Sequence, residues 1–208
     1  MPAPKLVVRP VAEPVNAVQS TAVPRAMILA AGRGARMRPL TDATPKPLLE
    51  VRGKPLIEWH LEALARGGVR DVVVNTAWLE EQIVAALGDG SRFGLSIRYS
   101  MEGRDHGGAL ETAGGIAKAL PLLADDPDDV FWVVSGDIHA PDFRFDVDPE
   151  GRLSKADLLA HLWLVANPPY HPQGDFGLAH DGMGLADSAG PDGRRWTYAN
   201  IALGRARL

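Results

Sequence analysis

The residues best suited to chemistry lie between positions 29 and 48, where the chain reads L-A-A-G-R-G-A-R-M-R-P-L-T-D-A-T-P-K-P-L. Gly32 and Gly34 lack a Cβ atom, so the backbone can adopt positive φ angles and bring its N–H groups close to phosphate oxygens. Arg36 follows at once, and Lys46 lies between two prolines that stiffen its backbone. The residue types and their spacing predict a site that holds a triphosphate.

Two better-known glycine loops do not fit this segment. The P-loop pattern G-x-x-x-x-G-K-[ST] and the dinucleotide pattern G-x-G-x-x-G both require a glycine where this chain has Met37. The apolar run from Ala26 to Ala31 precedes the glycines and predicts a buried strand that ends at the loop. The loop is therefore a third kind of phosphate-binding turn at the end of a strand.

A candidate metal ligand follows a second apolar strand. Val133 and Val134 lead into Ser135, Gly136 and Asp137, so one carboxylate is presented at the carboxyl end of a strand. Mg²⁺ prefers oxygen ligands and often takes one or two carboxylates, with water and substrate phosphates completing its shell. The alternative interpretation is that Asp137 only caps a turn.

The segment at 29–48 closely resembles the pattern L-A-A-G-x-G-x-R-[ML]-x-P-L-T-x-x-x-P-K-P of sugar-1-phosphate nucleotidyltransferases, also called nucleotide-sugar pyrophosphorylases. The resemblance implies a three-layer, Rossmann-like (GT-A-like) α/β fold with a mostly parallel central sheet. It also implies Mg²⁺-dependent transfer of a nucleotidyl group from a nucleoside triphosphate to a sugar 1-phosphate, with release of pyrophosphate. Arg36, Lys46 and Asp137 would be catalytic, and Asp137 would hold the Mg²⁺.

The resemblance also implies which residues contact the nucleotide. The chain from Glu102 to Gly115, E-G-R-D-H-G-G-A-L-E-T-A-G-G, is similar to the family's base-binding segment E-x-x-x-L-E-T-x-G-G, with seven residues between Glu102 and Leu110 where relatives commonly have three or four. This longer spacing leaves the nucleobase open. The nucleotide-binding positions expected from the resemblance are Ala31, Gly32, Gly34, Ala35, Met37, Glu102, Gly114, Gly115 and Ser135.

The sugar substrate is suggested by a later segment, N-P-P-Y-H-P-Q-G-D-F, at residues 167–176. It resembles N-P-x-x-H-x-x-G-D-F in the branch of the family that uses UTP and N-acetylmuramate 1-phosphate in cell-wall peptidoglycan recycling. The residues expected at the sugar nucleotide are Glu111, Thr112, Asn167, Asp175 and Asn200. Two alternatives stay open: a mannose- or glucose-1-phosphate nucleotidyltransferase, and a non-catalytic module that binds a nucleotide or a sugar phosphate.

Relatives continue beyond this sequence with a W-x-[DN]-[VI]-G-T strand, whose acid commonly supplies a second Mg²⁺ ligand, and a helix. The resemblance therefore leads us to expect reduced activity and self-association for a chain that ends at Leu208.

Composition narrows the class of protein. The chain has 208 residues, of which 46% are hydrophobic and 23% charged, which is typical of one globular domain. A net charge of -4 argues against a nucleic-acid partner. The sequence contains no run of eighteen apolar residues, so it predicts no membrane span. The chain has no cysteine, which excludes disulfides and thiolate chemistry and suits the cytoplasm.

The elements that must position these residues alternate along the chain. Apolar patterns predict helices near residues 56–64, 79–87 and 116–123, and strands near residues 69–75, 95–100, 130–134 and 158–166. This alternation favours an α/β domain from residue 26 to 208 with ligand loops at the carboxyl ends of the strands. We expect the proline-rich residues 1–25 to form a disordered extension, and residues 167–192 to form an irregular segment with a hairpin.

Overall fold

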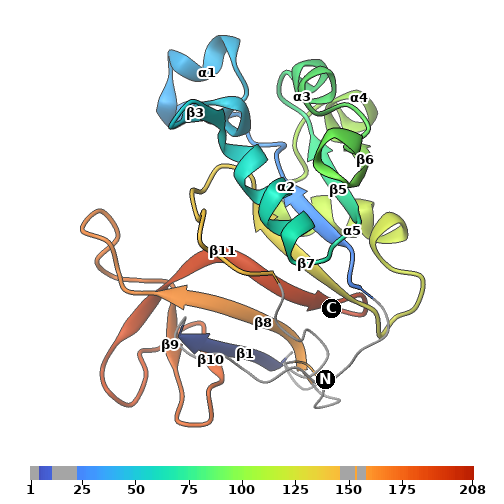
Figure 1. Ribbon diagram of the computed structural model, residues 1–208. Coiled ribbons are helices and arrows are strands. Elements are labelled where there is room, and N and C mark those ends of the chain that lie inside the picture. Colours follow the sequence, from blue (N-terminus) through green and yellow to red (C-terminus); the bar gives the residue numbers. More distant parts are fainter. Residues whose placement is uncertain (1–4, 11–22, 146–152, 154–157) are drawn as a thin grey trace.

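The computed structural model describes residues 5–10, 23–145, 153 and 158–208 (Figure 1). Within these residues, nine strands form one sheet in which the order β1-β8-β11-β7-β2-β5-β6 runs from edge to edge, with β9 and β10 attached beside β11. The strands are β1 (Lys5–Pro10), β2 (Ala26–Leu29), β5 (Asp71–Thr76), β6 (Ser96–Met101), β7 (Val130–Ser135), β8 (Leu158–Val165), β9 (Phe176–Leu178), β10 (Gly184–Leu185) and β11 (Arg195–Arg205). A separate ribbon pairs β3 (Glu50–Val51) with β4 (Lys54–Pro55).

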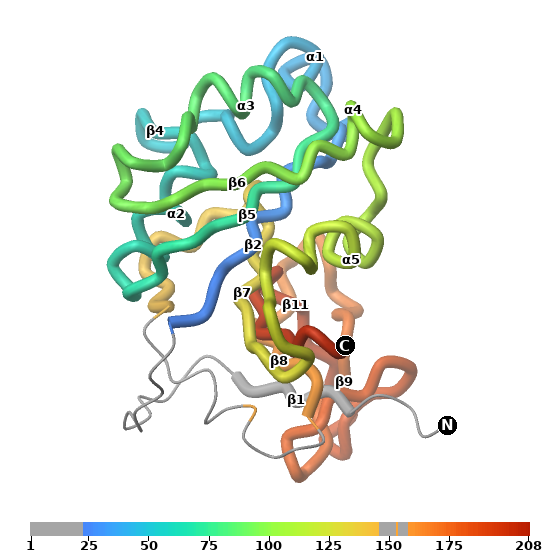
Figure 2. The backbone as a smooth tube through the Cα atoms, turned by 90° about the vertical axis from the view of Figure 1, so that its right-hand side faces the viewer, coloured from blue at the N-terminus to red at the C-terminus, as the bar shows by residue number. Residues whose placement is uncertain are grey.

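The sheet has a parallel half and a mixed half. β7, β2, β5 and β6 are parallel to one another, so their carboxyl ends meet at one edge. β11 runs antiparallel to both β7 and β8 and lies between them. Figures 1 and 2 show the helices gathered around β2, β5 and β6, with the long strands β8 and β11 on the other side of the molecule. The predicted mostly parallel α/β sheet is confirmed for the half that carries the glycine loop.

Helices cover both faces of the parallel half, as the amphipathic patterns predict. α2 (Leu56–Arg66) and α3 (Glu80–Leu87) pack with Ile28 and Val74 in one apolar cluster. α5 (Glu111–Leu123) packs with Met27 and Val73 in a second cluster. Because neighbouring residues of a strand point to opposite faces, the two clusters lie on opposite sides of the sheet. This gives the expected three layers of helix, sheet and helix.

Short helices build the loops at the carboxyl ends of the strands. These are the 3₁₀ turns η1 (Ala35–Met37) and η2 (Lys46–Leu48) and the α-helices α1 (Leu40–Ala43) and α4 (Glu102–His106), whereas the 3₁₀ turn η3 (Ser91–Phe93) lies before the amino end of β6. The predicted hairpin between residues 167 and 192 is confirmed by the antiparallel pairing of β9 with β10. None of the helices in the described part of the chain is long and apolar enough to cross a membrane.

Two expectations differ from the structure. The extension 1–25 was expected to be disordered, yet Lys5–Pro10 forms β1 and pairs in parallel with β8, because the edge of β8 offers unpaired backbone N–H and C=O groups. Residues 1–4 and 11–22 lie outside the described part. The helix predicted near residues 116–123 begins at Glu111, so it includes Gly114 and Gly115 of the segment that resembles the family's base-binding segment.

Candidate active site

The glycine loop adopts the conformation that its sequence predicts. Gly34 has a φ of 66°, in the left-handed region, and its carbonyl accepts hydrogen bonds from Met37 N at 2.9 Å and Thr41 Oγ1 at 2.8 Å. A Cβ atom added at Gly34 would lie 2.9 Å from Thr41 Cγ2, so both the angle and the space require glycine. The turn places Arg36 in η1, directly after the glycines.

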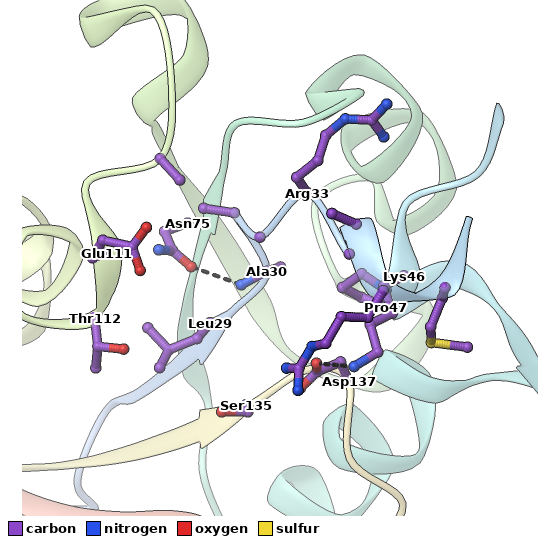
Figure 3. A pocket seen from close by; sticks show the side chains of 17 residues that line it. Leu29, Ala30, Arg33, Lys46, Pro47, Asn75, Glu111, Thr112, Ser135 and Asp137 are labelled. Atoms are coloured by element: carbon purple, nitrogen blue, oxygen red, sulfur yellow. Dashed lines mark hydrogen bonds and ion pairs between the residues drawn. The ribbon is translucent and has the colours of Figure 1, made fainter. Parts of the chain in front are cut away.

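Lys46 and Asp137 form the centre of the site. η2 carries Lys46, the loop after β7 carries Asp137, and Lys46 Nζ donates to Asp137 Oδ2 at 2.5 Å (Figure 3). The two side chains keep 25% and 34% of their surface exposed, so both are accessible from solvent. The sequence predicts a site role for each of the two residues separately. The parallel pairing of β2 with β7 brings the loops that carry them together.

A cavity of about 410 Å³ lies over the carboxyl ends of β2, β5 and β7. Its walls come from the glycine loop, Lys46, Ser135, Asp137, Asn75 and the start of α5 (Figure 3). The expected site residues in its lining are Ala31, Gly32, Gly34, Ala35, Arg36, Met37, Lys46, Glu111, Thr112, Ser135 and Asp137. Arg33, Arg36 and Lys46 are among the lining residues, and this local positive charge suits a polyanion.

A larger cavity of about 1270 Å³ adjoins the first on the side of β8, β9 and β11. Of the residues expected at the sugar, Asp175 and Asn200 line this cavity. Glu111 and Thr112, also expected there, line the smaller cavity instead. The residues common to both cavities are Arg36, Met37, Lys46 and Asp137. Two ligands bound in the two cavities would therefore meet at the Lys46–Asp137 pair.

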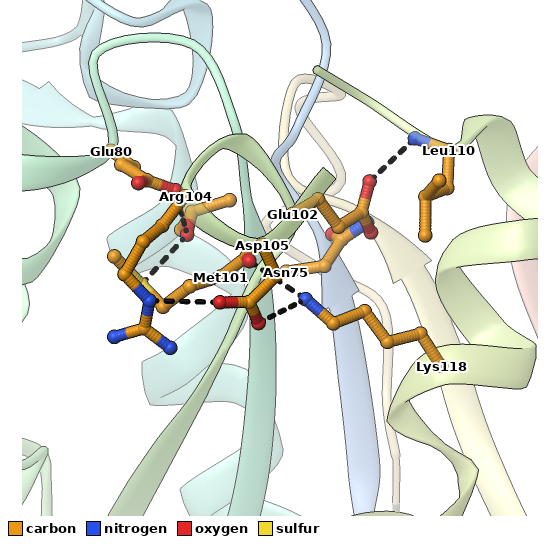
Figure 4. Close-up of polar contacts among 9 residues, drawn as sticks. Asn75, Glu80, Met101, Glu102, Arg104, Asp105, Leu110 and Lys118 are labelled. Carbon is orange, nitrogen blue, oxygen red and sulfur yellow. Dashed lines mark hydrogen bonds and ion pairs between the residues drawn. The ribbon is translucent and has the colours of Figure 1, made fainter. Parts of the chain in front are cut away.

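Glu102 does not contact either cavity, although it was expected to bind the nucleotide. It is completely buried, where its Oε1 accepts from Asn75 Nδ2 at 2.7 Å and its Oε2 accepts from Leu110 N at 2.7 Å (Figure 4). Asn75 Oδ1 in turn accepts from Ala30 N at 2.8 Å, at the start of the glycine loop. The Glu102 carboxylate therefore links α4 to β5 and to the residue before α5, and through Asn75 to the start of the glycine loop.

Gly114 and Gly115 also lie outside the cavity linings, although Glu111 and Thr112 of the same helix, α5, line the smaller cavity. A Cβ atom at Gly115 would come within 2.7 Å of Glu102 Oε1 and 2.8 Å of Asn75 Nδ2. The missing side chain of Gly115 thus leaves room for the buried hydrogen bonds of Glu102 and Asn75, and its backbone does not face a ligand.

On the surface above these buried hydrogen bonds, Asp105 Oδ2 accepts from Lys118 Nζ at 2.6 Å, and hydrogen bonds from Arg104 and Lys118 lower the pKa of Asp105 to about 2.

Two of the residues expected at the sugar are held by the framework. Asp175 accepts from Tyr198 N through Oδ2 at 2.8 Å, and its Oδ1 lies 3.0 Å from His171 Nε2. Asn167 donates to the carbonyls of Pro172 and Arg195 and accepts from Thr197 Oγ1 at 2.9 Å, and it does not line the larger cavity. These contacts tie the hairpin region to β11 and shape the wall of the cavity.

Asn200 is less firmly held. Its side chain makes contacts of 3.4 Å with Ser135 Oγ and Tyr198 O, and its φ is 59°. Asparagine tolerates this left-handed conformation better than most residues, and Asn200 lies where the pairing of β11 with β8 shifts register between Tyr198 and Ala202. Of Asn167, Asp175 and Asn200, Asn200 lines the larger cavity and has the longest contacts within the protein, so its side chain is the most available to a ligand.

Sequence reasoning missed several residues of the site. Asn75 lines the smaller cavity, and its position as a polar residue at the end of a buried strand was a usable signal. His139 and Tyr170 line the larger cavity, and the Tyr170 side chain is 89% exposed there. The loop sequence around Tyr170 carries no spacing that distinguishes a lining residue from a solvated one.

The chain matches the family described as nucleotidyl transferase over residues 25–186. It is 50% identical over 189 residues to the N-acetylmuramate alpha-1-phosphate uridylyltransferase of Neisseria meningitidis serogroup B, covering 88% of this chain and 76% of that protein. It is 36% identical to the enzyme of the same name from Caulobacter vibrioides, covering 79% of this chain and 69% of that protein.

A likeness in fold extends to solved structures of lower identity. The crystal structure of HddC from Yersinia pseudotuberculosis superposes with a TM-score of 0.66 at 20% identity, covering 89% of this chain and 78% of that one. At this identity the likeness concerns the fold alone.

Proposed function

The chain belongs to the nucleotidyl transferase family, whose sugar-1-phosphate members join a nucleotidyl group to a sugar phosphate, and we propose that it transfers the uridylyl group of UTP to N-acetylmuramate 1-phosphate. The substrates follow those named for the two uridylyltransferase relatives. We further propose that the reaction takes place in the cytoplasm and serves the reuse of cell-wall sugars.

One observation carries the proposal: the Lys46–Asp137 pair lies where the two cavities meet. We assign the smaller cavity to the nucleoside triphosphate, because the glycine loop and its cations line it. We assign the larger cavity to the sugar 1-phosphate. The two phosphate groups that must react would then face each other at the shared residues.

The reaction requires no protein nucleophile. An oxygen of the sugar 1-phosphate attacks the α-phosphorus of the triphosphate, a new P–O bond forms, and the bond to the β-phosphate oxygen breaks. The electron pair leaves with pyrophosphate, and no proton has to move because the attacking phosphate is already ionised. Catalysis then rests on positioning and on neutralising negative charge.

The cations have separate tasks in this scheme. Arg36, in η1, would bind the leaving pyrophosphate. Lys46 uses one of its three N–H donors on Asp137, and the other two can bind oxygens of the reacting phosphates. Both positions are backbone-anchored, by η1 and by the prolines around η2, so little entropy is lost when phosphate binds.

The residues present fit a Mg²⁺ ion, which we propose as the cofactor. Asp137 offers a hard oxygen ligand at the boundary of the cavities, and the described residues contain no cluster of three or more His, Cys, Asp or Glu that could hold a metal by themselves. Substrate phosphates and water would have to supply the other ligands. When bound, Mg²⁺ would neutralise charge on the phosphates.

A pyrophosphate-release assay tests the proposal. The protein is incubated with Mg²⁺, each of the four common nucleoside triphosphates, and the 1-phosphates of N-acetylmuramate, mannose and glucose. We expect UTP with N-acetylmuramate 1-phosphate to give the highest kcat/KM, by at least about tenfold. A preference for mannose or glucose 1-phosphate would contradict the assigned sugar, and no release with any pair would favour a binding module.

A further inference from the structure

The loop with the sequence G-R-G-A-R-M-R contains arginines whose surroundings differ. Arg36 has no hydrogen-bond or ion-pair partner within the described part of the chain. Arg33, between the two glycines, donates from Nη1 to Thr41 O at 2.9 Å and from Nη2 to Asp42 Oδ1 at 3.0 Å. Figure 3 shows Arg33 directed away from Lys46 and Asp137. Arg33 contributes to the lining of the smaller cavity, but its guanidinium is bound to α1, while that of Arg36 is available to a ligand.

Trp78 completes the contacts of Arg33. The Arg33 guanidinium carbon lies 3.3 Å from the centroid of the Trp78 ring, which is a close cation–π stack. Trp78 Nε1 also donates to Thr41 O at 2.9 Å, so that one carbonyl accepts from both members of the stack. Gln82, on α3, donates to Ala43 O at 3.0 Å at the end of α1. The connection from β5 to α3 thus holds α1 at several points.

These contacts fix the ends of the turn that carries Arg36. Thr41 is fully buried, and its hydroxyl donates to Gly34 O at 2.8 Å. Gly34 precedes η1 and Thr41 follows it, so both ends of the turn are tied to the same group of atoms. If the stack were lost, Thr41 O would lose the hydrogen bonds from Arg33 and Trp78. The turn from Gly34 to Thr41 would then be held less firmly against the connection from β5 to α3.

We propose that Arg33 and Trp78 are positioning residues that hold the glycine loop so that Arg36 faces the triphosphate. The segment G-R-G-A-R-M-R then divides its cations between two tasks: Arg33 and Arg38 bind Asp42 of the protein, and Arg36 binds the phosphates. This inference rests on the proposed function, because it assigns Arg33 a role in the same site.

A double-mutant cycle tests it. Turnover and KM for UTP are measured for Arg33→Ala, Arg36→Ala and the double variant, with thermal melting of each protein as a check on folding. We expect Arg33→Ala to lower kcat/KM for UTP by about tenfold or more, and the double variant to be within about twofold of Arg36→Ala alone, because residues that act as one unit are not additive. The exposed Arg66→Ala, on α2, serves as the matched control and should leave kcat/KM unchanged.

Trp78 gives a second, independent arm. Trp78→Phe keeps an aromatic face for Arg33 but loses the bond to Thr41 O, so we expect a smaller loss than for Trp78→Ala. Trp78→Ala combined with Arg33→Ala should be no worse than either change alone. The comparison of Trp78→Phe with Trp78→Ala remains informative if Arg33→Ala does not fold.

The outcomes separate this inference from the proposed function. If Arg36→Ala lowers turnover but Arg33→Ala does not, the positioning role is wrong and the site assignment stands. If the losses of Arg33→Ala and Arg36→Ala multiply in the double variant, Arg33 acts on the substrate by itself and the inference is overturned. If Arg36→Ala has no effect, the proposed function of the loop fails first.

Discussion

At the scale of single residues, the site depends on Lys46 and Asp137, which meet although 91 positions separate them in the sequence. Neither side chain belongs to the apolar core, and each is held by a short structured loop. Substitution here should therefore change the chemistry of the site and leave the fold intact.

We expect Lys46→Ala and Arg36→Ala each to lower kcat by about 10² to 10³, because each removes one preorganised cation from the phosphates. The melting temperature should stay near that of the parent protein. Steady-state pyrophosphate release and thermal melting measure the two quantities. Parent-like turnover in both variants would refute the assignment of the loop.

Asp137→Asn should raise the Mg²⁺ concentration needed for half-maximal activity and lower the maximal rate, because the amide keeps the shape of the side chain but not its charge. A titration of activity with Mg²⁺, made side by side with the parent protein, measures both effects. Superimposable titration curves would show that Asp137 does not hold the metal.

At the scale of elements, the buried hydrogen bonds of Glu102 and Asn75 explain a glycine inside a helix. An alanine is normally better in a helix interior than a glycine, by about 1 kcal/mol. At Gly115, however, the added Cβ would lie 2.7 Å from Glu102 Oε1. We expect Gly115→Ala to lower the free energy of unfolding by about 1–3 kcal/mol, because overpacking outweighs helix propensity.

Gly108→Ala is the matched control, because nothing lies within 4 Å of a Cβ atom added there. It should change the free energy of unfolding by no more than about 0.5 kcal/mol. Denaturant unfolding of both variants gives the comparison. A stabilising Gly115→Ala would mean that the network can move to admit a methyl group.

The buried side chain of His60 should make the free energy of unfolding depend on pH. Its Nε2 lies 2.9 Å from Ile138 O, while its buried Nδ1 has no hydrogen-bond partner in the described part of the chain. Burial lowers the pKa of His60 below 6.5, with His139 acting in the same direction, while the bond to Ile138 and the charge of Asp137 oppose the shift. The unfolded chain therefore binds a proton at this residue near pH 6.5, where the folded protein does not.

The contribution of His60 to the free energy of unfolding is fully present above pH 6.5. As the pH falls below 6.5, the free energy of unfolding decreases by up to about 1.4 kcal/mol per pH unit. His60→Gln, which can still donate to Ile138 O but does not titrate, should show a shallower loss between pH 7 and pH 5. Denaturant unfolding across this pH range measures the slope. The exposed His180→Gln should keep the slope of the parent protein, and an equally steep slope in His60→Gln would exclude His60 as its source.

At the scale of the whole molecule, ligand binding should stabilise the protein cooperatively. Asp137 supplies one carboxylate, so Mg²⁺ needs the phosphates of the triphosphate to complete its shell. We expect UTP and Mg²⁺ together to raise the melting temperature by more than the sum of their separate effects, through linked binding to the folded state. Asp137→Asn should remove most of the excess, and a strictly additive effect in the parent protein would contradict shared coordination.

The sequence was most informative where a residue's role depends on its immediate neighbours. The left-handed Gly34 and the stiffened Lys46 follow from local patterns, and so do the helices with one apolar face. The burial of Glu102 against Asn75 could not be predicted, because a motif letter does not show whether a carboxylate faces a ligand or a buried asparagine. The Arg33–Trp78 stack and strand β1 depend on residues far apart in the chain, and no local pattern predicts such contacts.

The place of β11 in the sheet has a consequence for how the protein is made. β11 is the last strand in the described sequence, yet it lies between β7 and β8 and pairs with both. During synthesis on the ribosome, β7 and β8 emerge first and wait on the order of seconds for the strand that joins them. Until then their inner edges are unpaired, which invites contacts with other nascent chains. Insertion of β11 closes long chain loops, so we expect it to be the slow step of folding and the point at which chaperones act.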